Sequence, residues 1–234
     1  MNNIKDTAAA LFIEQFKWAL WFTGIMTAIR IVLHIVDHFV ETEDLPVDSF
    51  VEFAYQPGKI FLLVLGIMSA YYFLGTLIEH GKTRKTFFKS TLISAGLLAV
   101  TLPIFAFVLN VVENLIITPA VDTAVINNTA LQTYSITAFL AFCFTIFLYY
   151  TLGMLIGIGY YRFGWLFGFA FVAAGLLTLL IESMIWGTEF FLFGIALDNP
   201  GTVPLPALAL TAVLAAVISY AAFRFIKRTP VKLE

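Results

Sequence analysis

Charged residues are scarce in this sequence. Asp, Glu, Lys and Arg together make up 12% of 234 residues, whereas hydrophobic residues make up 61%. A water-soluble domain of this size could not bury so much apolar surface, because a folded chain of this length still exposes a large exterior. The scarcity of charge therefore excludes a soluble globular protein. The formal net charge of −2 identifies no partner, and we expect no nucleic acid among the ligands.

Several motifs of well-known chemistry are also missing. The only cysteine, Cys143, excludes an intramolecular disulfide. No Gly-x-x-x-x-Gly-Lys-Ser/Thr phosphate loop occurs, so we expect any ATP hydrolysis to be carried out by another polypeptide. No Gly-x-Ser-x-Gly elbow and no His-Glu-x-x-His helix is present to support an intramembrane enzyme.

Long apolar stretches are what the sequence does contain. A hydrocarbon core of about 30 Å requires roughly 20 helical residues to cross it. Helices are preferred to barrel strands, since the stretches show no polar and apolar alternation and each backbone group must be satisfied within its own segment. The sequence predicts one all-α membrane domain over residues 1–234. Its six transmembrane helices are expected at Trp18–Val36, Ile60–Ile78, Phe87–Val112, Tyr134–Ile158, Phe163–Ile185 and Leu205–Ile226.

The basic residues are confined to alternate gaps between these stretches. The second gap (Glu79–Thr86), the turn around Arg162 and the C-terminal tail hold most of them, whereas the first, third and fifth gaps are acidic. By the positive-inside rule, both termini and the second and fourth gaps are expected to be cytoplasmic. The pattern predicts a multi-pass protein of the cell membrane.

The segment before the first span is amphipathic. Apolar residues recur at helical spacing from Ile4 to Phe16, with Lys5 and Glu14 on other faces. This pattern predicts a helix that lies in the cytoplasmic membrane interface. The alternative is a simple extension of the first membrane helix.

The second gap has a distinctive order of residues. Glycine permits a tight turn, Thr83 can cap a new helix, and a phenylalanine pair can anchor that helix at the membrane. The residues of this basic turn are Gly81, Lys82, Thr83, Arg84, Lys85, Phe87, Phe88 and Lys89. The order resembles the loop after the second helix in permease subunits of ABC exporters of the ABC-2 type. The fourth gap is similar to a tight turn of the same family through Arg162, Phe163 and Gly164. Lys82 departs from the family, which more often has an apolar residue there.

This resemblance carries several expectations. The basic turn would be a short coupling helix that docks onto a separate cytoplasmic ABC ATPase, which would hold ATP and magnesium. The chain itself would bind no cofactor, would catalyse no reaction, and would form the pathway with a second permease copy or a paralogue in the lipid bilayer. The apolar segment Glu182–Gly201 is similar to the paired re-entrant half-helices of these exporters.

A polar stripe follows one side of the first predicted span. Its members are Arg30, His34, Asp37 and His38. An unpaired arginine within a membrane span would be costly, so we expect Arg30 to face the bundle interior or a wet cavity, with Glu113 or Glu182 as its ion-pair partner.

Three interpretations of the stripe remain open. It could form an interhelical ion pair with interfacial histidines, or it could line the transport pathway. The spacing of His34, Asp37 and His38 also fits a metal or catalytic site, although no third helix supplies further ligands and we expect no metal. The alternatives to a permease are accordingly an intramembrane enzyme or metal-binding protein that uses this stripe, or a membrane scaffold or channel without an ATPase.

Overall fold

A computed structural model describes residues 4–40, 49–117, 136–187, 190–192, 195–197 and 204–227. Almost all of these residues are helical. The elements are α1 (Ile4–Val40), α2 (Phe50–Met68), the π-helical segment η1 (Ser69–Phe73), α3 (Leu74–Glu79), α4 (Arg84–Ile117), α6 (Ile136–Trp186), β1 (Phe190–Leu192), β2 (Ile195–Leu197) and α7 (Pro204–Lys227). Within the described residues, five helices are long and apolar enough to cross a membrane, so the chain is a multi-pass membrane protein.

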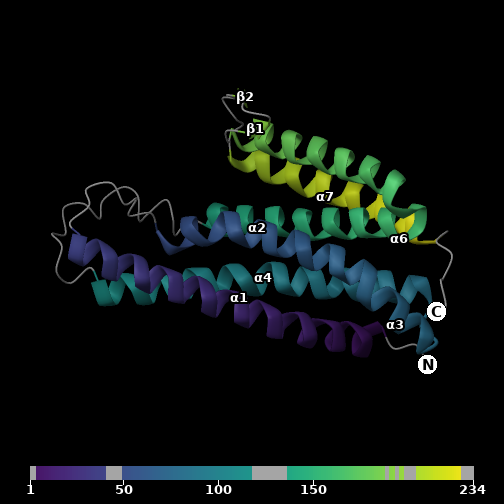
Figure 1. Cartoon of the computed structure of the whole chain (residues 1–234), viewed down its shortest axis with the longest axis horizontal. Coiled ribbons are helices and arrows are strands. Elements are labelled where there is room, and N and C mark those ends of the chain that lie inside the picture. Colours follow the sequence, from purple (N-terminus) through teal and green to yellow (C-terminus); the bar gives the residue numbers. More distant parts are fainter. Residues whose placement is uncertain are drawn as a thin grey trace.

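The helices form a bundle with its long axes roughly aligned (Figure 1). The first arm of α6 packs on α2, and α1 packs on α4. The second arm of α6 and α7 form a further layer on the opposite side from α1 (Figure 1). Buried apolar residues fill the interior, and a chain of hydrogen bonds crosses it: Ser94 Oγ donates to Gln15 Oε1, and Gln15 Nε2 donates to Tyr150 Oη.

The helix α1 is continuous from Ile4 to Val40. The expectation of a separate interfacial helix before Trp18 is therefore wrong, and its alternative, an extension of the first membrane helix, holds. The segment contains no proline and only Gly24 as a glycine, so nothing in its backbone favours a break.

The helix α2 begins at Phe50 rather than at Ile60 as predicted. Ser49 accepts a hydrogen bond from the Glu52 backbone N–H, and the Glu52 side chain accepts one from the Ser49 backbone, which completes a capping box. Pro57 lies inside the helix. Membrane helices tolerate an interior proline because their surroundings satisfy the freed carbonyl.

The chain reverses direction within α6. Gly164 has φ 78° and ψ −176°, which is not helical, and it separates two arms that pack against each other. The second arm returns along the first, since a methyl group built on Gly175 would contact the Ile156 side chain. The tight turn expected after Arg162 is thus present, and the left-handed φ of Gly164 explains why glycine occupies it.

The segment after α6 differs from the half-helices expected between Glu182 and Gly201. Its described residues pair as two short antiparallel strands, with Phe190 opposite Leu197. Glu182 lies within α6 and not in the predicted gap between the fifth and sixth spans, because α6 continues to Trp186. Glu113 likewise lies inside α4 and not in the third gap.

Candidate functional site

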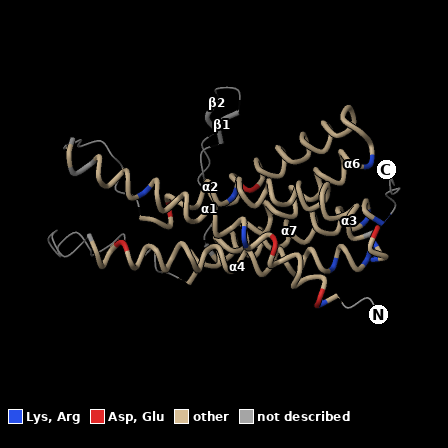
Figure 2. Tube along the Cα trace, turned by 60° about the horizontal axis from the view of Figure 1, so that its bottom comes forward, with Lys and Arg blue, Asp and Glu red and all other residues tan. Residues whose placement is uncertain are grey.

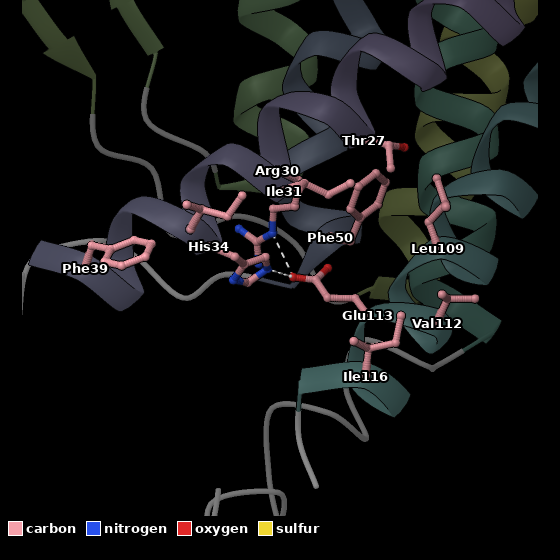
Figure 3. A pocket seen from close by; sticks show the side chains of 11 residues that line it. Thr27, Arg30, Ile31, His34, Phe39, Phe50, Leu109, Val112, Glu113 and Ile116 are labelled. Carbon is pink, nitrogen blue, oxygen red and sulfur yellow. Dashed lines mark hydrogen bonds and ion pairs between the residues drawn. The ribbon is translucent and has the colours of Figure 1, made fainter. Parts of the chain in front are cut away.

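The candidate site is a pocket at the end of the bundle far from the described termini. Its volume is about 420 Å³, and it lies between α1, the start of α2 and the last turns of α4 (Figure 3). Most of its lining is aliphatic or aromatic. Its residues are Thr27, Arg30, Ile31, His34, Ile35, Phe39, Phe50, Leu109, Val112, Glu113 and Ile116.

Three ionisable side chains meet in this pocket. Arg30 Nε donates to Glu113 Oε1 at 2.8 Å, and His34 Nε2 lies 2.5 Å from the same oxygen (Figure 3). An ionised carboxylate oxygen only accepts hydrogen bonds, so a His34 tautomer with its proton on Nε2 is the donor to it. Arg30 and Glu113 are largely shielded from solvent, with side-chain exposures of 9% and 14%. An ion pair in this setting is screened much less than a surface pair.

The second carboxylate oxygen of Glu113 has a different environment. Oε2 is buried and accepts no hydrogen bond from the part of the chain that the structure describes. A buried acceptor without a partner costs about 1–3 kcal/mol, so native structures rarely leave one. The pocket therefore combines apolar walls with one buried acceptor that has no partner among 4–40, 49–117 and the other described residues.

The polar stripe expected on the first span is resolved in part. Arg30 and His34 are brought together on Glu113, whereas Glu182, the other carboxylate considered for Arg30, lies elsewhere. Asp37 and His38 belong to α1, but their side chains lie outside the described part of the structure. Over the described residues, no group of three His, Cys, Asp or Glu side chains is placed to hold a metal ion.

A second polar cluster lies in the bundle interior. Lys59 on α2 and Glu182 on the second arm of α6 are buried, with exposures of 4% and 2%. Lys59 Nζ is 3.9 Å from Glu182 Oε1, and Tyr149 Oη donates to Glu182 Oε2 at 3.4 Å. The ammonium also lies over the Tyr55 ring, 4.6 Å from its centroid, which is cation–π geometry.

Sequence reasoning missed Lys59. The residue directly precedes the second predicted span, so it could be taken as the polar end of a helix. The signal that could have found it is the capping box at Ser49 and Glu52, which places the helix start upstream and therefore places Lys59 inside the helix.

The two turns that carry the family resemblance lie at the same end of the bundle. Gly81 has φ 72°, and Thr83 Oγ1 accepts from the Thr86 backbone N–H at 3.1 Å, so Thr83 caps α4 as expected. Arg84 donates to the Lys227 carbonyl at 3.5 Å, and Arg162 donates to the Phe225 carbonyl at 3.1 Å. These bonds bring both turns to the end of α7.

The basic turn differs from the expected coupling helix in two respects. Arg84–Lys89 is the beginning of the 34-residue helix α4 and not a separate short helix. Phe87 and Phe88 are buried in the bundle, with exposures of 0% and 8%, so they fix α4 to its neighbours. The exposed side chains of the turn are those of Thr83, Lys85 and Lys89, and Lys82 and Arg84 are half-buried.

Comparisons with protein-family models, with curated proteins and with solved structures gave no match to this chain.

Proposed function

We propose that this chain is the membrane-spanning permease subunit of an ATP-driven ABC exporter, coupled to a separate cytoplasmic ATPase. One observation supports the proposal most. The turn at Gly81–Lys89 and the turn at Arg162–Gly164, which resemble the cytoplasmic turns of such permeases, lie together at one end of the bundle. Basic residues gather at this end, and both described termini lie there too (Figure 2).

The lengths of the helices suggest how the bilayer covers the bundle. In the proposed arrangement the two arms of α6 each cross the membrane, which gives six crossings with both termini in the cytoplasm. A bilayer hydrocarbon core about 30 Å thick, with its inner boundary near Gly164, covers the second arm of α6 and α7. Glu182, about 27 Å from Gly164 along the helix, then lies within the hydrocarbon core. Glu113, about 44 Å from Arg84 along α4, lies near the outer headgroups.

An exposed ion pair on α1 supports a second permease copy. Lys17 and Glu14 are joined at 2.8 Å, and their side chains are 58% and 52% exposed. The neighbouring Gln15 bonds Tyr150, which lies about 21 Å from Gly164 along α6, so the pair lies at membrane depth. Charges at this depth are costly against lipid and usually face another protein surface or a wet cavity. In our proposal this face of α1 meets a second permease copy or the pathway.

Cysteine labelling tests the six-crossing topology. In a Cys143→Ser background, single cysteines replace Phe39 and Ile136 at one end, and Lys85 and Trp165 at the other; all four native side chains are exposed. We expect an impermeant maleimide to label Phe39→Cys and Ile136→Cys in intact cells, and to label the other two variants only after lysis. Labelling of Lys85→Cys in intact cells would overturn the orientation. Labelling of Trp165→Cys alone in intact cells would overturn the crossing by the first arm of α6.

A charge reversal tests the ATPase contact. The double variant Lys85→Glu/Lys89→Glu should reduce recovery of the partner ATPase at least about tenfold, because like charges placed across an interface cost several kcal/mol. The measurement is mass-spectrometric quantification of any protein with a Walker A loop that co-purifies with the tagged chain from mild detergent. Membrane level of the variant is measured alongside.

The matched control carries the same charge change at the same end. Lys5→Glu/Lys227→Glu alters two exposed residues outside the basic turn and should retain the ATPase. Equal loss in both double variants would show a general charge effect and would refute a specific docking role for the turn. If the wild-type chain brings down no ATPase, the permease proposal fails, and a scaffold or channel becomes the better description.

A further inference from the structure

The pocket at the Arg30–Glu113 pair has an unmatched hydrogen-bonding requirement. Its walls are apolar, and its buried Glu113 Oε2 accepts no hydrogen bond from the described residues. A molecule that fills the pocket would therefore gain most from an apolar body and one donor group directed at this oxygen. A purely hydrocarbon occupant would leave the buried acceptor unsatisfied, at a cost in affinity.

The charge balance of the pocket selects the kind of donor. The Glu113 carboxylate is already neutralised by the Arg30 guanidinium and receives a second hydrogen bond from His34. A cationic ligand would bring a second positive charge beside the Arg30 guanidinium in an apolar setting, where like charges repel strongly. An uncharged donor such as a hydroxyl group satisfies Oε2 without disturbing this balance.

The open side of the pocket indicates where the occupant comes from. Ile31, Ile35 and Ile116 line the pocket and are 55%, 51% and 73% exposed. In the bilayer placement proposed above, on which this step rests, these side chains lie at the level of the outer headgroups, as Glu113 does. A molecule dissolved in the outer leaflet with its hydroxyl at headgroup level would reach the pocket laterally.

We infer that this pocket binds an uncharged, long-chain hydroxyl compound from the outer leaflet, with its hydroxyl group donating to Glu113 Oε2 and its chain against the isoleucine-rich walls of α1 and α4. The volume of about 420 Å³ lies within the range of small-molecule sites and is lined as such sites are, by apolar groups with a few polar ones. In the proposed exporter this would be a substrate site or an effector site that opens to the outer leaflet.

Photolabelling tests the inference without requiring transport. The purified chain in phosphatidylcholine nanodiscs is irradiated with 1-hexadecanol that carries a diazirine in its alkyl chain, and the labelled peptides are located by mass spectrometry. We expect labels on α1 and α4 residues of the pocket, displaced by unlabelled 1-hexadecanol. Its methyl ether has no O–H to donate and should compete about ten- to a hundredfold less well, which corresponds to the net contribution of one hydrogen bond to a charged group.

Two pocket-filling variants and a matched control complete the test. Val112→Trp and Ile35→Trp place bulk in the pocket and should each abolish the displaceable labelling. Val108→Trp lies one helical turn before Val112 on α4, is also exposed and does not line the pocket, so it should label normally. Equal competition by the alcohol and its ether would refute the hydrogen bond, and displaceable labelling that survives both filling variants would refute the pocket. Because no ATPase is present, either result leaves the permease proposal standing.

Discussion

Gly153→Ala should destabilise the protein by about 3 kcal/mol or prevent its folding, at or beyond the upper end of the usual cost of overpacking. The reason is the close approach of α6 to α2. A methyl group at residue 153 would overlap the backbone carbonyl oxygen of Leu63, and one at residue 66 would overlap that of Tyr150. A backbone atom cannot move aside by a rotamer change, so the two helices would have to separate. Small residues permit such contacts between membrane helices.

The matched control is Gly96→Ala in α4. A methyl group there meets no atom within 4 Å, so the substitution should be neutral or stabilise the helix by up to about 1 kcal/mol. The measurement is SDS titration of the purified variants in mild detergent, with recovery of monodisperse protein as a second readout. Gly66→Ala should behave like Gly153→Ala. If both variants unfold at the same SDS concentration as Gly96→Ala, the close packing of α2 on α6 is wrong.

The sequence was sufficient to predict the helical class and the approximate positions of the membrane helices. Length and hydrophobicity decide these features, because a bilayer imposes them on any chain that crosses it. The turn at Gly164 was also predicted, because the basic Arg162 separates two long apolar runs and a glycine two residues later permits a tight turn. The start of α2 was misplaced because Pro57 and the acidic residues before it are more typical of a loop, while a local capping box overrides them.

Pairing between distant helices could not be predicted to the same degree. The polar stripe on α1 required a carboxylate partner for Arg30. Glu113 and Glu182 were predicted at a similar depth in the membrane, so depth alone could not show which of them is the partner. That choice depends on which helix packs beside α1: α4 does, and Glu113 lies on it. Glu182 lies on the second arm of α6, which packs on the other side of the bundle and brings it to Lys59 (Figure 1).

Lys59→Met and Glu182→Gln should each destabilise the protein by about 3–5 kcal/mol, whereas the double variant should lie within about 1 kcal/mol of the wild type. Each single change leaves an uncompensated charge in the bundle interior, which is far more costly than the loss of the pair itself. The double change removes both charges. Glutamine keeps an oxygen that accepts from Tyr149 Oη, and methionine keeps an unbranched chain over the Tyr55 ring.

A double-mutant cycle by SDS titration measures this coupling, with Lys85→Met as the control for loss of an exposed lysine. The control should change stability by less than about 0.5 kcal/mol, as surface substitutions usually do. The long separation of 3.9 Å between Lys59 Nζ and Glu182 Oε1 makes the pair weak as a bond, so the expected effect comes from the stranded charge and not from the lost attraction. Additive losses in the double variant would contradict a buried pair. They would mean that water reaches at least one of the two groups and that this part of the bundle is open to a wet pathway.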